Sequence, residues 1–199
     1  MTTRLVLIRH GITQWNIQKR YCGYQDVSLS KQGKIQAVEL RKNIKNIRFD
    51  RIYCSDRKRA LMTKAILFGK TDFIKEKDLR EIHFGLIEGL NYDQIMQKYP
   101  KAYKEWLTDP YKGRIPQAES MQVFKKRVMG AIKKILTANC GKTIAVVCHG
   151  GVIAIFVSSI LQNRKFWSYV PHPASVTVID YKDHKFKIKV FDKKQIRGC

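Results

Sequence analysis

Histidine and arginine residues follow three apolar segments that are typical of buried strands. The three groups are Arg9-His10-Gly11, residues 55–60 with Arg59, and His149-Gly150-Gly151. In open α/β sheets, ligands bind beyond the carboxyl ends of the strands. Two arginines and two histidines gathered there would form a cationic cup, and the glycines would let backbone amides approach an anion. The chemistry that this pattern favours is the binding of an anionic group.

Each group taken alone has an ordinary structural explanation. A histidine after a buried strand is usually a packed core residue or a helix cap, and the basic run 57–59 is usually a solvated helix face. All three groups, however, fall at predicted strand ends. We therefore interpret them together as one site.

The elements that must position these residues alternate between strands and helices. Apolar runs predict strands at 5–8, 51–54 and 143–148, and helical spacing predicts helices at 35–47, 57–68, 120–136 and 152–161. Residues 175–181 and 186–190 are predicted to form two strands joined by a short turn. The pattern predicts an α/β fold: a three-layer sandwich with a mainly parallel central sheet flanked by helices and an antiparallel edge near the C-terminus. No repeat or linker divides the chain, so we expect one domain over residues 1–199.

The composition excludes some classes of protein. The 199 residues include 39 Lys+Arg and 16 Asp+Glu, a formal charge of +23, and 44% are apolar, which argues against disorder. Such a charge attracts phosphorylated metabolites, nucleic acids and anionic membranes alike. No basic motif interleaved with aromatic residues is present, so no specific nucleic-acid partner is expected. The most apolar stretch, 144–161, is broken by residues 148–151, and the N-terminal apolar run is too short for a signal peptide, so neither membrane insertion nor export is expected.

The cysteines suggest a reducing compartment. They are Cys22, Cys54, Cys140, Cys148 and Cys199, an odd set without a C-x-x-C pair. Neither a disulfide framework nor a zinc knuckle is predicted from this spacing, and a cytoplasmic protein is expected.

Five blocks of the sequence resemble the histidine phosphatase (phosphoglycerate mutase-like) superfamily, in the family's order. The blocks are residues 7–16 with Arg9-His10-Gly11 and Asn16, residues 23–33, 55–65, 79–89, and 148–151. Three positions depart from the family pattern: Arg57 stands for Leu, Ile87 for Trp, and Ala118 for the Gly of a G-E-S triplet. Arg57 would add charge near the pocket mouth. If Ala118 takes a positive φ, the cost is about 1 kcal/mol, or the loop has shifted.

The resemblance implies that His10 attacks phosphorus as a neutral imidazole and becomes a phosphohistidine, with its other ring nitrogen held by a backbone carbonyl. Arg9, Arg59, His149 and Asn16 would surround the phosphoryl oxygens, because guanidinium groups can engage two oxygens at once. Further substrate contacts are expected from Gly11, Thr13, Tyr24, Gln25 and Gly150. The resemblance implies no metal and no cofactor.

Glu81 occupies the acid position of the family. It would protonate the leaving oxygen and then deprotonate the attacking water, and a nearby phosphate dianion would favour its protonated form. Glu88 is the alternative acid, although its place before Gly89 suggests a structural role. His83 matches no catalytic position and is expected to be a surface or packing histidine.

The leading hypothesis is a metal-independent phosphomonoesterase acting on a small phosphorylated metabolite. The short segment between Gly85 and Gln117 resembles the compact phosphatases, and residues 173–177 resemble α-ribazole phosphatases, so α-ribazole 5′-phosphate is a candidate substrate. A phosphoglycerate mutase and a non-catalytic phosphate- or nucleic-acid-binding protein remain alternatives. Cysteine-phosphatase (C-x₅-R) and D-x-D patterns are absent. The chain would act as a monomer or homodimer.

Overall fold

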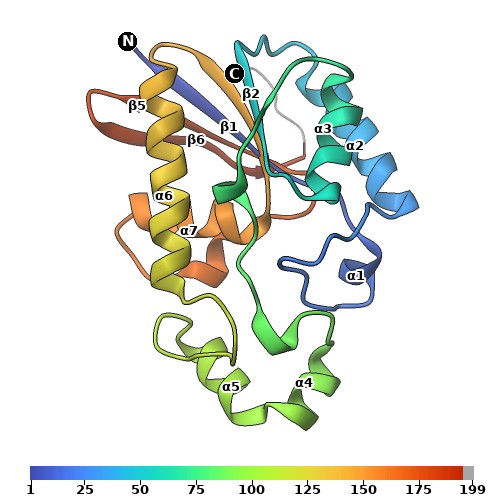
Figure 1. Ribbon diagram of the computed structural model, residues 1–199. Coiled ribbons are helices and arrows are strands. Elements are labelled where there is room, and N and C mark those ends of the chain that lie inside the picture. Colours follow the sequence, from blue (N-terminus) through green and yellow to red (C-terminus); the bar gives the residue numbers. More distant parts are fainter. Residues whose placement is uncertain (195–199) are drawn as a thin grey trace.

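A six-stranded sheet forms the centre of the computed structural model, which describes residues 1–194 (Figure 1). Its strand order is β3-β2-β4-β1-β5-β6. The strands are β1 (Thr3–Arg9), β2 (Arg51–Cys54), β3 (Ile74–Lys75), β4 (Thr143–Cys148), β5 (Val176–Lys182) and β6 (Lys185–Lys193). The first four are mutually parallel where they pair, and β5 and β6 add an antiparallel edge. The predicted fold class is confirmed.

The helices cover both faces of this sheet. Side chains alternate between the faces of β1: Leu5 and Leu7 pack with α6 (Met121–Ala138) and α7 (Gly150–Ile160). Val6 and Ile8 pack on the other face with α2 (Lys31–Ile44) and α3 (Lys58–Phe68). In Figure 1, α2 and α3 lie together on one side of the sheet and α6 and α7 on the other. A strand buried on both faces has no polar face to alternate with, so its sequence is a continuous apolar run.

A smaller helical region lies beyond the carboxyl ends of the strands (Figure 1). It contains α4 (Tyr92–Lys98) and α5 (Pro100–Thr108), and the short α1 (Gln14–Ile17) lies beside it. Its own core includes Ile87, Ile95 and Trp106. These three helices and the two-residue β3 were not predicted. The elements α1, α4 and β3 are too short to show a clear hydrophobic period, whereas α5 is amphipathic, buries Tyr103 and Trp106, and was missed. The 3₁₀ turns Lys77–Leu79, Gly85–Ile87 and Phe166–Tyr169 complete the connections.

The buried face of α2 differs from the predicted one. The sequence spacing placed Ile35 and Val38 on an apolar face, but they are 63% and 45% exposed, and the helix ends at Ile44, before Ile47. The buried residues of the helix are Gly33, Ala37, Leu40 and Ile44, of which Leu40 and Ile44 pack with the strands. Because Gly33 has no side chain, the helix backbone lies close to the Ile12 carbonyl in the loop after β1, and this face of the helix is the buried one.

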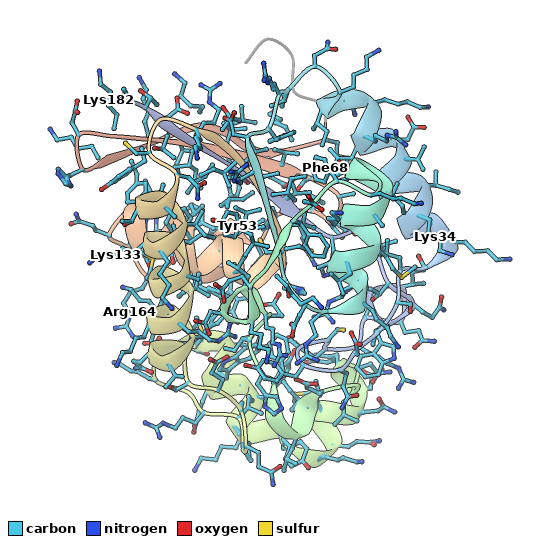
Figure 2. All side chains as sticks on the ribbon, turned by 45° about the horizontal axis from the view of Figure 1, so that its top comes forward. Lys34, Tyr53, Phe68, Lys133, Arg164 and Lys182 are labelled. Carbon is cyan, nitrogen blue, oxygen red and sulfur yellow. The ribbon has the colours of Figure 1, made fainter. Side chains whose placement is uncertain are left out.

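The positive charge is spread over the surface. Figure 2 shows Lys34 on α2, Lys133 on α6, Arg164 and Lys182 pointing outward from different sides, while Tyr53 and Phe68 lie within. None of the helices in residues 1–194 combines the length and apolar character needed to traverse a bilayer. Cys22, Cys54, Cys140 and Cys148 are free thiols, and Cys199 lies outside the described residues.

Two helical glycines provide a test of this packing. A Cβ added to Gly33 would lie 2.0 Å from the Ile12 carbonyl oxygen, whereas one added to Gly130 in α6 would meet nothing within 4 Å. We expect Gly33→Ala to lower the free energy of unfolding by about 1–3 kcal/mol through overpacking. Gly130→Ala should raise it by about 0.5–1 kcal/mol, because alanine favours the helix. Urea denaturation measures both, and changes of the same sign would contradict the close approach at Gly33.

Candidate active site

His10 follows β1 directly and is almost fully buried. Its Nδ1 lies 2.7 Å from the carbonyl oxygen of Gly11. Because a carbonyl only accepts hydrogen bonds, Nδ1 carries the ring proton and Nε2 keeps its lone pair. Burial holds the pKa of His10 well below its usual 6.5, and the charges of Arg59 and Arg9 lower it further. His10 is therefore a neutral imidazole with an unprotonated Nε2.

Arg9 lies beside His10 with a partly satisfied guanidinium. Its Nη1 donates a hydrogen bond to the carbonyl oxygen of Pro171, while its buried Nε has no partner among the described residues. Burial lowers the pKa of Arg9, and the carboxylates of Glu81 and Asp192 raise it. A Cβ at Gly150 would lie 3.0 Å from the Arg9 Cζ, so the glycine makes room for this guanidinium. The Nε–H is therefore an unsatisfied donor inside the protein, which is the kind of group that a bound anion could satisfy.

Arg59 is fully buried and engages the protein itself. Its Nε donates to His149 Nδ1 at 3.2 Å. Its terminal nitrogens donate to the carbonyl oxygens of Gln25 at 2.9 Å, Gly23 at 2.7 Å and Cys22 at 3.3 Å. Four of the five N–H groups thus have acceptors, and Arg59 ties His149 to the loop at 22–25. Its expected contact with two phosphoryl oxygens would need some of these bonds to be exchanged.

His149 lies at the end of β4, with its ring centroid 5.1 Å from that of His10. Since its Nδ1 accepts from Arg59, its Nε2 carries the proton and donates to Ser55 Oγ at 2.8 Å. Burial holds the pKa of His149 well below 6.5, with further lowering by Arg59 and His10. Both ring nitrogens are engaged, so this histidine supports Arg59 and packs against His10 in the present arrangement.

The two candidate acids occupy different environments. Glu81 lies at the N-terminus of α7, where Oε2 accepts the Gly151 N–H at 2.9 Å and Oε1 accepts the Ile82 N–H at 2.9 Å. A Cβ at Gly151 would lie 2.1 Å from Oε1, so the second glycine of the motif makes room for the acid. Glu81 and His10 line one cavity.

Glu88 holds two loops together. Its carboxylate accepts the backbone N–H groups of Tyr24 at 2.7 Å, Gln25 at 3.0 Å and Phe84 at 3.1 Å. It is not among the residues that line the cavity with His10. The structural role expected for Glu88 agrees with these contacts.

The cavity at His10 has a volume of about 380 Å³. Of the predicted residues, it is lined by Arg9, His10, Asn16, Glu81 and Gly150. Sequence reasoning missed its other polar and aromatic walls, which include Lys19, Arg20, Tyr21, Tyr92, Tyr103, Phe166 and Trp167. Lys19 and Arg20 could have been proposed as lining residues, because they are basic and closely follow the first motif. The aromatic residues lie in segments without a recognised motif, so nothing in the sequence indicated them.

Several other predicted residues do not line this cavity. Thr13 is fully buried and forms a capping box with Asn16, whose Oδ1 accepts from the Thr13 backbone and hydroxyl at 2.9 Å. Gly11 packs against Gly33. Tyr24 packs on His83, with ring centroids 4.8 Å apart, and Gln25 is exposed. These residues shape the loops around the site.

The structure also places two of the three residues that depart from the family pattern. Arg57 stacks on the Tyr24 ring, 5.1 Å from its centroid, and does not line the cavity. Ala118 does not adopt a positive φ; Gln117, one residue earlier, has φ 60°. Of the two alternatives for this loop, strain at Ala118 or a shifted loop, the strain is absent, and the left-handed residue is Gln117.

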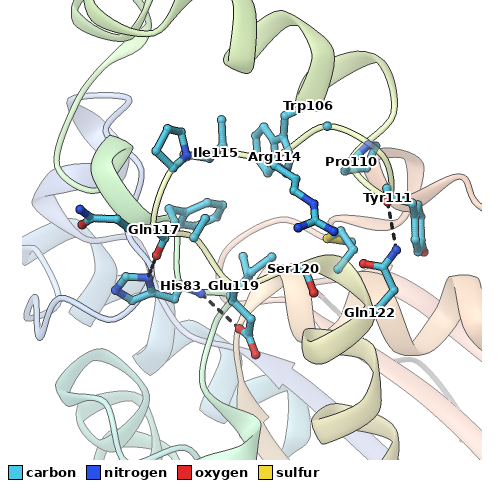
Figure 3. Close-up of a pocket in the computed structure, with 16 residues that line it drawn as sticks. His83, Trp106, Pro110, Tyr111, Arg114, Ile115, Gln117, Glu119, Ser120 and Gln122 are labelled. Carbon is cyan, nitrogen blue, oxygen red and sulfur yellow. Dashed lines mark hydrogen bonds between the residues drawn. The ribbon is translucent and has the colours of Figure 1, made fainter.

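That loop borders a second cavity of about 390 Å³. Figure 3 shows His83 and Gln117 at one end of it and Tyr111 and Gln122 at the other. His83 lies 3.1 Å from the Gln117 carbonyl oxygen through Nδ1. Ile82 and Phe84 line both cavities, so the segment that follows Glu81 separates them.

Comparison with known proteins identifies the family. The model of the histidine phosphatase superfamily (branch 1) matches residues 5–194. The chain belongs to this superfamily. Its three-layer fold and its ordered motifs are those of the compact members, and it is a phosphoric monoester hydrolase.

Two curated relatives and one solved structure illustrate the range of this superfamily. The metal-independent phosphoserine phosphatase of Arabidopsis thaliana is 34% identical, covering 94% of this chain and 79% of its own. The phosphoglycerate mutase-like protein 4 of the same plant is 35% identical over 75% of this chain and 67% of its own. A putative α-ribazole-5′-phosphate phosphatase from Escherichia coli matches with a TM-score of 0.90 and 26% identity, covering 98% of both chains.

The lowered pKa values of the two buried histidines predict how stability depends on pH. Both rings are neutral when folded but take up protons after unfolding below pH about 6.5, so their contribution is present above that pH and lost as the pH falls. Between pH 7.5 and 5.5, protonation of each of these two histidines in the unfolded state should lower the free energy of unfolding by about 1.4 kcal/mol. Over this pH range, the free energy of unfolding of His10→Gln, measured with urea, should fall by about 1.4 kcal/mol less than that of the wild type. Equal losses in the two proteins would mean that His10 titrates normally.

Proposed function

We propose that the enzyme hydrolyses a small phosphomonoester through a phosphohistidine at His10. The observation that carries this proposal is the fixed tautomer of His10, with Nδ1 bonded to Gly11 and Nε2 unprotonated in the cavity that it shares with Arg9 and Glu81. A nitrogen nucleophile must present a lone pair, and this ring does so without first losing a proton. Nε2 would form the bond to phosphorus as the bond to the ester oxygen breaks.

Three donors would stabilise the charge that develops on the phosphoryl oxygens. The Arg9 Nε–H has no protein partner, and the Asn16 Nδ2 has no acceptor among the described residues, because Thr13 engages only its oxygen. The N-terminus of α7, an 11-residue helix, adds a partial positive charge at Gly150. Preorganised donors of this kind act without reorganisation during the reaction.

Glu81 would complete both chemical steps. In the first, its carboxylic acid would donate a proton to the leaving oxygen as an alcohol departs. In the second, its carboxylate would take a proton from water while the water oxygen attacks phosphorus, which releases inorganic phosphate and restores neutral His10. The position of Glu81 in the same cavity as His10 supports this assignment over Glu88.

For the substrate, we propose a leaving group with a planar, partly apolar portion. The walls of the cavity are rich in aromatic side chains, among them Tyr92 and Trp167, which are 55% and 39% exposed to solvent. A phosphate ester of α-ribazole, the candidate from sequence, has such a ring, and the similarity to the E. coli structure supports it. Phosphoserine, named for the plant relative, lacks one. The ratio of kcat/KM for these two esters distinguishes the candidates.

Replacement of the nucleophile tests the reaction type. We expect His10→Ala to abolish hydrolysis of an aryl phosphate, and the acid-labile, base-stable phosphoryl label of the wild type to disappear. Wild-type activity should survive EDTA, since the proposed donors are side chains and a helix terminus. Label retained on His10→Ala would contradict the assignment. Interconversion of phosphoglycerates faster than phosphate release would favour the mutase alternative instead.

A pair of glutamate variants tests the acid. Glu81→Gln should slow hydrolysis of alkyl phosphates far more than that of nitrophenyl phosphate, because an alkoxide needs a proton to leave whereas a nitrophenolate does not. Glu88→Gln is the matched control and should leave the alkyl-to-aryl ratio of kcat/KM unchanged. If the ratio shifts in Glu88→Gln and not in Glu81→Gln, the two roles are exchanged.

A further inference from the structure

Residues 171–175 support the backbone of Arg9, the last residue of β1, and of His10, which follows it. The Pro171 carbonyl oxygen accepts a hydrogen bond from Arg9 Nη1. The Ser175 carbonyl accepts the Arg9 N–H at 3.1 Å, and the Ala174 N–H donates to the His10 carbonyl at 3.1 Å. The direction of the Arg9 guanidinium therefore depends on where this segment is held.

One carboxylate from β6 holds the segment in place. Asp192 Oδ1 accepts the His172 N–H at 2.7 Å, and Oδ2 pairs with His172 Nδ1 at 2.5 Å. Ser175 Oγ closes the turn by donating to the His172 carbonyl at 2.6 Å. His172 directly follows Pro171, whose carbonyl oxygen accepts the hydrogen bond from Arg9. The carboxylate of Asp192 therefore holds both the backbone and the side chain of the residue next to Pro171.

The backbone of β6 is distorted at Asp192. The pairing of β5 with β6 passes from Val176–Lys193 to Val178–Val190, so β6 contains an extra residue at this point. Asp192 itself has φ 51°, in the left-handed region that residues with a side chain rarely adopt. A bulge of this kind redirects a side chain out of the regular strand pattern. Here it brings the carboxylate to His172.

Asp192 also interacts electrostatically with Arg9. Burial opposes ionisation of Asp192, but the hydrogen bonds from His172 bring the pKa of its carboxyl below the usual value. The resulting negative charge raises the pKa of the Arg9 guanidinium, against the lowering by burial. Among the described residues, Glu81 alone has a larger effect of this sign on Arg9. Asp192 thus contacts the segment that holds Arg9 and favours the charged form of its guanidinium, without lining the cavity.

We propose that Asp192 and His172 form a clamp that positions Arg9 for the phosphoryl group, with Asp192 as the positioning residue. The inference rests on the proposed function, in which Arg9 binds the phosphoryl oxygens. Arg9 has one nitrogen held by the clamped segment and another, Nε, without a partner. Releasing the segment would let the guanidinium turn away from the reacting group.

The test compares two aspartates of the same hairpin. Asp192→Asn keeps the side-chain size and tolerates a positive φ, but loses the charge and weakens the contact with His172 Nδ1. We expect it to lower kcat/KM for an aryl phosphate by about tenfold to a hundredfold and to weaken vanadate inhibition by a similar factor. Asp183→Asn is the control: Asp183 has φ 49° in the turn of the hairpin, is exposed, and should change kcat/KM by less than about twofold.

A double-mutant cycle separates positioning from general loss of structure. If Asp192 acts through Arg9, then Asp192→Asn in an Arg9→Ala background should change the residual rate by less than about twofold. The clamp is overturned if Asp192→Asn is within twofold of the wild type, or if it costs the same factor in both backgrounds. If Asp192→Asn does not fold, His172→Ala in the same two backgrounds gives the same decision. A wild type that hydrolyses no phosphomonoester would instead overturn the proposed function.

Discussion

Burial of the Arg9 and Arg59 guanidinium groups beside His10 is the constraint on which the rest of the site depends. A buried cation must find acceptors, because its lost hydration is costly. Arg59 finds them in the carbonyl groups of the 22–25 loop, and Arg9 finds one at Pro171. The loops around the site are thus partly organised to satisfy two arginines, and burial, reinforced by the same positive charges, keeps His10 neutral.

These requirements link distant parts of the chain. The backbone N–H groups of the 22–25 loop donate to the carboxylate of Glu88, and its carbonyl groups accept from Arg59. One loop therefore provides hydrogen-bond partners for both a buried cation and a buried anion. Gly150 and Gly151 leave space for Arg9 and Glu81 against the first turn of α7. The glycines of the second histidine motif therefore make room for Arg9 and Glu81, in addition to following His149 at the start of α7. Substitution of Glu88, Gly150 or Gly151 should therefore alter the groups that surround His10.

The fold was predictable from sequence where burial is complete. β1 and β4 are apolar throughout because both of their faces are covered, and the histidines stand out because they follow such runs. The roles of Arg59 and His149 were less predictable, since their partners are backbone carbonyls and one hydroxyl, which leave no pattern of residue types. The same holds for α2, which approaches the loop after β1 at Gly33, and for the aromatic cavity wall, which comes from α4, α5 and the turn at Trp167.

The central claim is that His10 is neutral, with its proton on Nδ1 and its lone pair on Nε2. Nitrogen-15 NMR of protein labelled at histidine reads both properties directly, and His10→Gln identifies the signal. The account predicts that His10 stays neutral as the pH falls from 8 to 5.5, with the proton remaining on Nδ1. Protonation of His10 near pH 6.5, or a neutral ring with its proton on Nε2, would contradict it.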